Sequence, residues 1–192
     1  MSNLRTTADQ ILDCTRSLVI AGGYNGFSYA DIAAVVGIRK ASIHHHFPAK
    51  SDLVRTLVNR YRQEAEAGLA GLDSAIASPA ARLRAYAGYW ETCILDDTAS
   101  FCLCALLAGQ MTMLPEDVAL EVRTHFQTLS AWLTAVLSTG ADQGEFHLSA
   151  PPAVEADGFM ATVHGAMLSA RAYGDPATFA SIIQPALQRL GS

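Results

Sequence analysis

The stretch GIRKASIHHHFPAK, Gly37 to Lys50, places three consecutive histidines between a basic pair and a Phe-Pro step. Successive residues of a helix are rotated by about 100°, so three neighbouring histidines cannot converge on one metal ion. The inner side of the predicted helix carries Ile43, His46 and Phe47. The opposite side is therefore available to contact a partner.

Local signals around this stretch predict two short helices joined by a tight turn. Ser28 is a good N-cap, and Gly37 can supply the left-handed residue that ends the first helix. Pro48 disfavours helical geometry before it, which limits the second helix to about residues 39–47. Ser51 can cap the long helix that follows. Such a pair of helices is the helix-turn-helix arrangement, whose second helix enters the major groove of DNA.

The rest of the chain has helical periodicity and no alternating pattern long enough for a sheet. The predicted fold class is all-α, with an N-terminal three-helix head joined by a long helix to a C-terminal helical bundle. Proline lies near the start of most of the later helices, as is typical of first turns. These helices are expected at roughly 80–95, 101–112, 116–141, 152–172 and 177–190.

The charge of the chain is unevenly distributed. The formal net charge is −5, but residues 1–62 carry eight Lys and Arg against four Asp and Glu, whereas residues 63–192 carry five against fourteen. A polyanion is attracted to the first part and repelled by the second, which is the asymmetry of a DNA-binding head on a body with another role.

Composition indicates an ordered globular protein, with 192 residues, 51% hydrophobic and 16% charged. No apolar run is long enough to cross a bilayer and no secretion signal opens the chain, so we expect a cytoplasmic protein without a membrane partner. The four cysteines fit neither a disulfide framework nor a zinc site.

The outer side of the predicted reading helix offers groups suited to DNA. Lysine can contact phosphate or guanine, serine either bases or backbone, alanine a thymine methyl, and histidine can donate to either partner. Because imidazole gains charge as the pH falls from about 8 to 6, we expect operator affinity to rise over that range. The residues concerned are Lys40, Ala41, Ser42, His44 and His45.

The segment FSYADIAAVVGIRKASIHHHFPAKSDLV, residues 27–54, resembles the DNA-binding signature of the TetR family of transcriptional repressors. The resemblance implies that Ser28, Tyr29 and Lys50 contact phosphates and that residues 39–45 read the groove. It also implies that His46 and Phe47 are structural.

Two features depart from the family pattern. Arg39 replaces the usual Ser, Thr or Asn at the cap of the reading helix, and His44 and His45 occupy positions that more often hold aromatic residues. The preferred operator sequence therefore cannot be carried over.

The resemblance assigns residues 1–50 to DNA binding and residues 51–192 to effector binding and dimerisation. Two heads on a two-fold axis would address the half-sites of a palindrome. A small-molecule effector would release the DNA by favouring another spacing of the heads. Candidate effector-site residues are aromatic, histidine and methionine side chains, although such residues also fill ordinary cores: Tyr89, Trp90, Phe126, His125, His164 and Met160.

The stretch DDTASFCLCALLAGQ contains two cysteines about 200° apart on a helix, Cys102 and Cys104, which cannot easily bridge to each other. Near a helix start, backbone N–H groups and the dipole favour a thiolate at Cys102. FCLCALLAG also resembles a TetR branch that senses electrophiles or oxidants through the cysteine matched by Cys102, with Cys93 as its natural resolving partner. The alternative is that these cysteines are small buried core residues.

Two other functions compete with that of a ligand-released repressor. A thiol-dependent helical enzyme could pair Cys102 with His125 or His164, but no phosphate loop, metal-ligand pair or nucleophile elbow supports catalysis or a cofactor. The other competitor is a DNA-binding dimer that responds to no ligand. Our interpretation is a homodimeric TetR-like repressor released by a small molecule.

Overall fold

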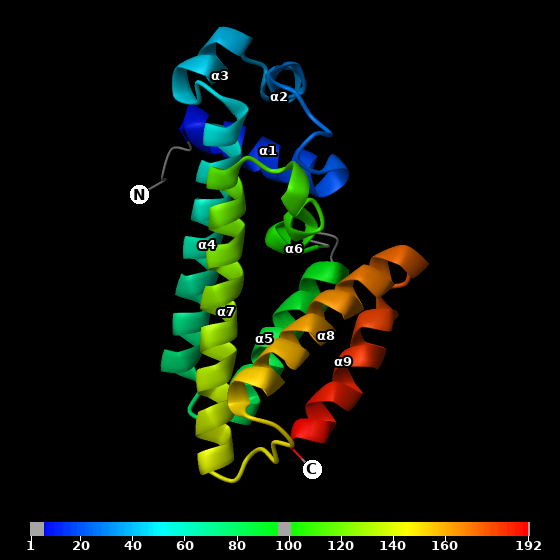
Figure 1. The fold of residues 1–192 in the computed structure, drawn as a ribbon. Helices are drawn as coiled ribbons and strands as arrows, with labels where there is room; N and C mark the ends of the chain where they lie inside the picture. The colour runs from blue at the N-terminus through cyan, green and yellow to red at the C-terminus, as the bar shows by residue number, and fades with distance from the viewer. Residues whose placement is uncertain (1–5, 96–100, 192) are drawn as a thin grey trace. The chain divides into compact units, whose positions relative to one another are not determined.

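The computed structural model describes residues 6–95 and 101–191, and in these ranges the chain is helical with no strand (Figure 1). The predicted all-α class is confirmed. Contacts divide the chain into two compact units, residues 1–63 with 103–125 (unit 1) and residues 64–102 with 126–192 (unit 2). The predicted boundary at residue 50 and the function of each part stay predictions.

Unit 1 contains the N-terminal helices and a short middle segment. Two long helices, α4 (Lys50–Ala75) and α7 (Glu116–Asp142), begin in unit 1 and continue into unit 2. The shorter elements of unit 1 are α1 (Thr7–Gly22), α2 (Tyr29–Val36), α3 (Lys40–His46), α6 (Leu103–Ala108) and the 3₁₀ turn η1 (Met111–Met113).

Side chains cap the start of α2 and the backbone of Gly37 caps its end, both where the sequence predicts them. The Ser28 hydroxyl accepts the Ala30 N–H at 3.2 Å, and the Asp31 carboxylate accepts the Ser28 backbone N–H at 2.7 Å. Gly37 follows the helix with φ 75° and ψ 31°, and its N–H donates to the Ala33 carbonyl. These contacts satisfy backbone groups that a helix end otherwise leaves unpaired.

Apolar side chains from α1 to α4 form the core of the head. Ile11 of α1, Ile32 of α2, Ile43 of α3 and Leu53 of α4 are fully buried. Burying one such side chain contributes about 1.5–3 kcal/mol relative to leaving it exposed. This core is what holds α2 and α3 together as a head.

The start of α4 differs from the prediction. The helix begins at Lys50, and the Asp52 carboxylate accepts the Ala49 N–H at 3.2 Å. Ser51 therefore lies inside the first turn, and the prediction that it caps the helix is wrong. The Asp52 side chain is longer than that of Ser51, so its carboxylate reaches back from within the first turn to the Ala49 N–H.

The helix predicted at 101–112 is also shorter than expected. It is divided into α6 and η1, and the Gln110 N–H donates to the Leu107 carbonyl between them. Residues 96–100, between the helices predicted at 80–95 and 101–112, lie outside the described residues.

Unit 2 contains α5 (Pro79–Leu95), α8 (Pro152–Tyr173) and α9 (Ala177–Leu190), with α8 and α9 side by side (Figure 1). Glu145 caps α5, since its carboxylate accepts the Ala80 N–H at 2.8 Å and the Ser78 hydroxyl at 2.7 Å. These hydrogen bonds lower the pKa of Glu145. Among the described residues, no helix has the length and apolar character to cross a membrane.

Candidate nucleic-acid interface

Helix α3 exposes the side that the sequence assigns to DNA. Lys40, Ala41, His44 and His45 are exposed, and Ser42 is half-buried. The predicted orientation of the helix is confirmed, whereas DNA contact itself stays a prediction. Arg39, just before the helix, is also exposed and makes no side-chain cap hydrogen bond.

The inner side of α3 is narrower than predicted. Phe47 is buried, but His46 is exposed, so its placement on the inner side is wrong. The physical reason is the early end of the helix, since Phe47 is already extended at φ −138°. The His46 ring contacts the His45 and Phe47 rings at centroid distances of 5.6 and 6.3 Å.

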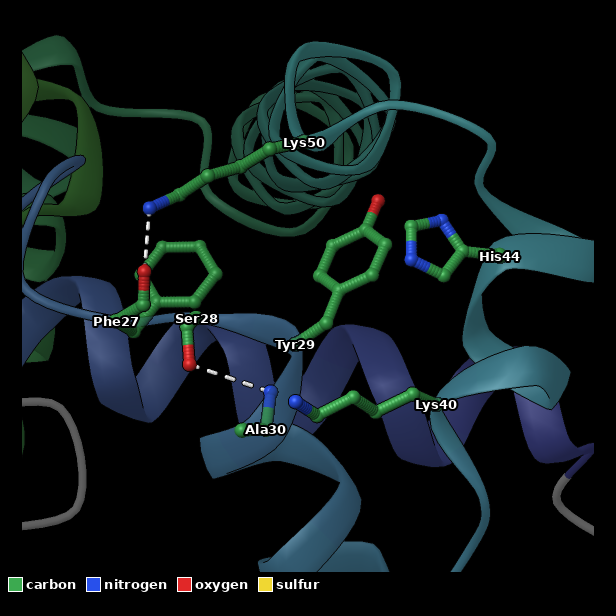
Figure 2. Close-up of a pocket in the computed structure, with 7 residues that line it drawn as sticks. All are labelled: Phe27, Ser28, Tyr29, Ala30, Lys40, His44 and Lys50. Atoms are coloured by element: carbon green, nitrogen blue, oxygen red, sulfur yellow. Dashed lines mark hydrogen bonds between the residues drawn. The ribbon is translucent and has the colours of Figure 1, made fainter.

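A hollow of about 380 Å³ lies at the start of α2, beside α3 and the beginning of α4 (Figure 2). Figure 2 shows two lysines and a histidine around it, with Lys40 and His44 from α3 and Lys50 from α4. A helix N-terminus with basic side chains nearby favours an anion such as a DNA phosphate. The lining residues are Phe27, Ser28, Tyr29, Ala30, Lys40, His44 and Lys50.

Lys50 is engaged within the head. Its ammonium donates a hydrogen bond to the Phe27 carbonyl (Figure 2). It also lies 4.0 Å from the centroid of the Phe27 ring and 5.2 Å from that of Tyr24. Burial lowers the pKa of Lys50. These contacts hold the start of α4 against the loop before α2, so Lys50 positions the rim of the hollow.

Tyr29 and Ser28 are also anchored inside the head. The Tyr29 hydroxyl donates to the Phe47 carbonyl at 2.8 Å, and its ring lies 4.7 Å from that of His44. Burial raises the pKa of Tyr29 to about 12, so its proton stays in place at physiological pH. The Ser28 hydroxyl donates to the Asp31 carboxylate at 2.8 Å.

Sequence reasoning missed Phe27 and Asp31 as residues that shape this site, and Gln110 as a residue that anchors the loop before α2. The role of Asp31 could have been predicted from the sequence, because an acidic residue three positions after a serine is typical of a capping box. Gln110 carried no signal, since it bonds to the backbone of a residue 86 positions away.

The candidate effector residues are divided between the units. His125 and Cys104 belong to unit 1, where the His125 ring is 5.4 Å from that of Tyr61. The other candidates belong to unit 2: Tyr89, Trp90, Cys93, Cys102, Phe126, Met160 and His164.

Exposure separates the unit 2 candidates further. Tyr89 is 55% exposed on the outer side of α5, whereas Trp90, Cys93 and Cys102 are buried. Cys102 directly precedes α6, so it lies at a helix start as the sequence predicts. Within the described residues, no cluster of His, Cys, Asp or Glu could hold a metal ion.

Three buried polar atoms of unit 2 make no hydrogen bond within the described chain: the Tyr86 hydroxyl, the Trp90 indole N–H and Nε2 of His164. An unsatisfied buried polar group costs about 1–3 kcal/mol. His164 contacts the Phe126 ring at 5.2 Å, and burial lowers its pKa to about 4, so the imidazole is neutral at physiological pH. Each of these buried groups lacks a partner that a bound molecule could supply.

The short helix pair with its exposed second helix defines a helix-turn-helix regulator of transcription. The chain belongs to the TetR family. Residues 11–57 match the family model of bacterial regulatory proteins of the tetR family, and residues 79–185 match that of the tetracyclin repressor-like C-terminal domain.

Solved structures agree with this family. A TetR-family transcriptional regulator from Agrobacterium tumefaciens is 62% identical, with a TM-score of 0.95 over 96% of this chain and 97% of that one. A TetR regulator from Legionella pneumophila is 26% identical, with a TM-score of 0.88 over 98% and 99%. E. coli NemR in its reduced form shares the fold at 19% identity, with a TM-score of 0.85 over 97% and 98%. No protein of curated function matches the chain.

Proposed function

We propose that this regulator is a cytoplasmic homodimeric repressor that binds a palindromic operator through α3 and is released by a small-molecule effector. The observation that carries the proposal is the exposed outer side of α3 on a head that is basic, while the rest of the chain is acidic. The positive charge of the head attracts duplex DNA, and the exposed side of α3 supplies the groups that distinguish bases.

Base contacts come from α3 in this proposal. Ala41 is small enough to approach a thymine methyl, and His44 and His45 present ring nitrogens to the groove. Arg39 and Lys40 lie at the helix start, where they reach guanine or phosphate. Ser42 is half-buried and contributes through its hydroxyl at the edge of the surface.

Phosphate contacts come from the hollow at the start of α2. Lys40 and His44 line it from α3, and Ser28, Tyr29 and Ala30 line it at the start of α2, where the helix dipole favours an anion. Tyr29 and Lys50 contribute mainly by holding the walls of the hollow, because the phenol proton and the ammonium are both engaged with backbone carbonyls.

Dimerisation is assigned to α8 and α9. One side of α8 is exposed and consists of small and aliphatic residues at alternating spacings of four and three. Gly158 and Gly165 on this side have open space where a Cβ would be, so a partner helix can approach closely. The exposed residues are Val154, Gly158, Ala161, Gly165, Leu168 and Ala172.

The effector site is assigned to unit 2, with a reactive electrophile or an oxidant acting at Cys102. The supporting observations are the position of Cys102 directly before α6 and the unpaired polar groups of Tyr86, Trp90 and His164 in the same unit. The sensing role of Cys102, and that of Cys93 as its resolving partner, are part of the proposal.

Selection from a random duplex library tests the DNA-binding part. We expect the purified protein to enrich a sequence with two-fold symmetry, and Lys40→Ala to weaken binding of that sequence. Enrichment of an asymmetric site, or none at low salt, would contradict the proposal.

Sedimentation tests the dimer. Leu168→Glu places a charge on the proposed interface and should yield monomers that no longer bind the selected site. Leu120→Glu is the matched control, because Leu120 is 58% exposed on α7 and Leu168 is 59% exposed on α8. If the two variants have the same oligomeric state, the exposed side of α8 is excluded as the dimer interface.

A further inference from the structure

Gln110 joins two segments of unit 1 that are far apart in the sequence. Its backbone connects α6 to η1, since its N–H donates to the Leu107 carbonyl at 2.9 Å and its carbonyl accepts the Met113 N–H at 2.8 Å. Its side-chain oxygen accepts the Tyr24 backbone N–H at 2.9 Å. The α6–η1 segment, residues 103–113, therefore holds the loop before α2 directly.

The loop before α2, residues 23–28, is shaped to receive this side chain. Only a residue without a side chain at Gly23 leaves room for the glutamine amide. The loop is tight, because the Gly26 N–H donates to the Gly23 carbonyl at 3.2 Å. Its two aromatic residues, Tyr24 and Phe27, are buried. Close packing of this kind passes a shift at one end of the loop to the other end.

The far end of the loop forms part of the hollow at the start of α2. Phe27 and Ser28 line the hollow, and the Phe27 carbonyl accepts the hydrogen bond from the Lys50 ammonium (Figure 2). The same ammonium lies 5.2 Å from the centroid of the Tyr24 ring. Tyr24 thus contacts Gln110 through its backbone and Lys50 through its ring. A continuous series of contacts within unit 1 leads from the α6–η1 segment to the rim of the hollow.

We propose that Gln110 is a positioning residue for operator binding, because its bond to Tyr24 holds the loop before α2 in the conformation that places the rim of the hollow against a DNA phosphate. The inference rests on the proposed function, in which the hollow takes a phosphate of the operator. Without the bond, the N–H of the buried Tyr24 lacks an acceptor, and the loop opens in part of the molecules to reach water. Operator affinity then falls in proportion to the fraction of molecules whose loop is closed.

Two substitutions of the full-length protein separate the acceptor from the size of the side chain. Gln110→Met keeps the length without an acceptor, and it should bind the symmetric duplex selected by the wild type about fivefold more weakly, as expected for one net hydrogen bond. Gln110→Glu keeps an acceptor oxygen and should bind within about twofold of the wild type at about 0.15 M salt, where its added charge is screened. Gln63→Met is the matched control, because Gln63 donates to Asn59 at 3.0 Å within α4, and it should leave the affinity unchanged.

A double variant tests whether Gln110 acts through the loop. Lys50→Met removes the contacts at the other end of the same loop. Because both single substitutions release one loop, their combination should lose less affinity than the product of the two single losses. Fluorescence anisotropy compares the four proteins well below their melting temperatures, where each is folded. Losses that multiply would show two independent effects and would overturn the role of the loop.

Hydrogen exchange followed by mass spectrometry reports on the loop without DNA. Amides of residues 22–28 should exchange faster in Gln110→Met than in the wild type, and at the wild-type rate in Gln63→Met. Faster exchange with unchanged operator affinity, or equal losses of affinity in Gln110→Met and Gln110→Glu, would overturn the positioning role and leave the DNA-binding proposal standing. If the wild type selects no symmetric duplex, the proposed function fails and the positioning role fails with it.

Discussion

The Gln110 side chain accepts a hydrogen bond from the Tyr24 backbone N–H at 2.9 Å, although 86 residues separate the two in sequence. The contact joins the segment between α6 and η1 to the loop between α1 and α2, within unit 1. Gly23, which directly precedes Tyr24, has φ 74°, and a Cβ at this position would lie 2.2 Å from the Gln110 amide nitrogen. The absence of a side chain at Gly23 is what lets Gln110 approach.

Gly23→Ala should destabilise the protein by about 2 kcal/mol or more, because it combines a strained positive φ with a steric clash. Gly22→Ala is the control, since nothing lies within 4 Å of its Cβ position and alanine favours the helix. Urea unfolding of both variants measures the difference. Equal stability of the two would show that neither the positive φ at residue 23 nor the clash with Gln110 costs stability.

Lys40 and Lys50 should differ in their contributions to operator binding and to the stability of the fold. Lys40→Met should weaken operator binding and reduce its salt dependence by about one unit of slope, with stability unchanged within about 0.5 kcal/mol. Lys50→Met should also destabilise the fold by about 1–2 kcal/mol, because it removes the bond to Phe27 and the contacts with two rings. Fluorescence anisotropy over a salt series and urea unfolding measure both effects. A Lys50 variant of unchanged stability would contradict its positioning role.

His45→Ala tests the pH dependence of DNA binding. His45 is exposed on α3, whereas His44 is held against Tyr29 and lies 3.4 Å from the Pro48 carbonyl through Nδ1. Operator affinity of the wild type should rise several-fold as the pH falls from about 8 to 6, and the variant should flatten this profile. Identical profiles, measured at constant ionic strength, would exclude a phosphate role for His45.

His164 should make stability depend on pH in the acidic range. Its pKa is about 4 in the folded protein, whereas an ordinary histidine has a pKa of 6.5, so between these values the unfolded chain binds more protons and stability rises with pH. The contribution is present above about pH 6.5 and is lost as the pH falls toward 4. We expect the wild type to lose about 2 kcal/mol more than His164→Asn between pH 7 and 5. Urea unfolding at the two pH values provides the measurement, and equal losses would show that the folded protein accepts the proton.

Local signals made the head predictable from its sequence. The Ser28 cap, the Gly37 turn and the burial of Ile32 and Ile43 depend on neighbours within about one helical turn, so a short window contains their causes. The exposed side of α3 follows from the same periodicity. The wrong predictions, the Ser51 cap and the buried side chain of His46, both lie at helix ends. There a shift of one residue changes which group caps the helix and where the helix stops.

Contacts between distant segments were decided by the tertiary structure alone. The direction of the Lys50 ammonium depends on a carbonyl 23 residues earlier, and the bond from Tyr24 depends on Gln110. The unused hydroxyl of Tyr86 is likewise a property of packing, because a sequence shows which polar groups exist but not which ones find a partner after burial. Periodicity identifies the face of a helix that is buried, whereas only the folded chain determines what that face meets.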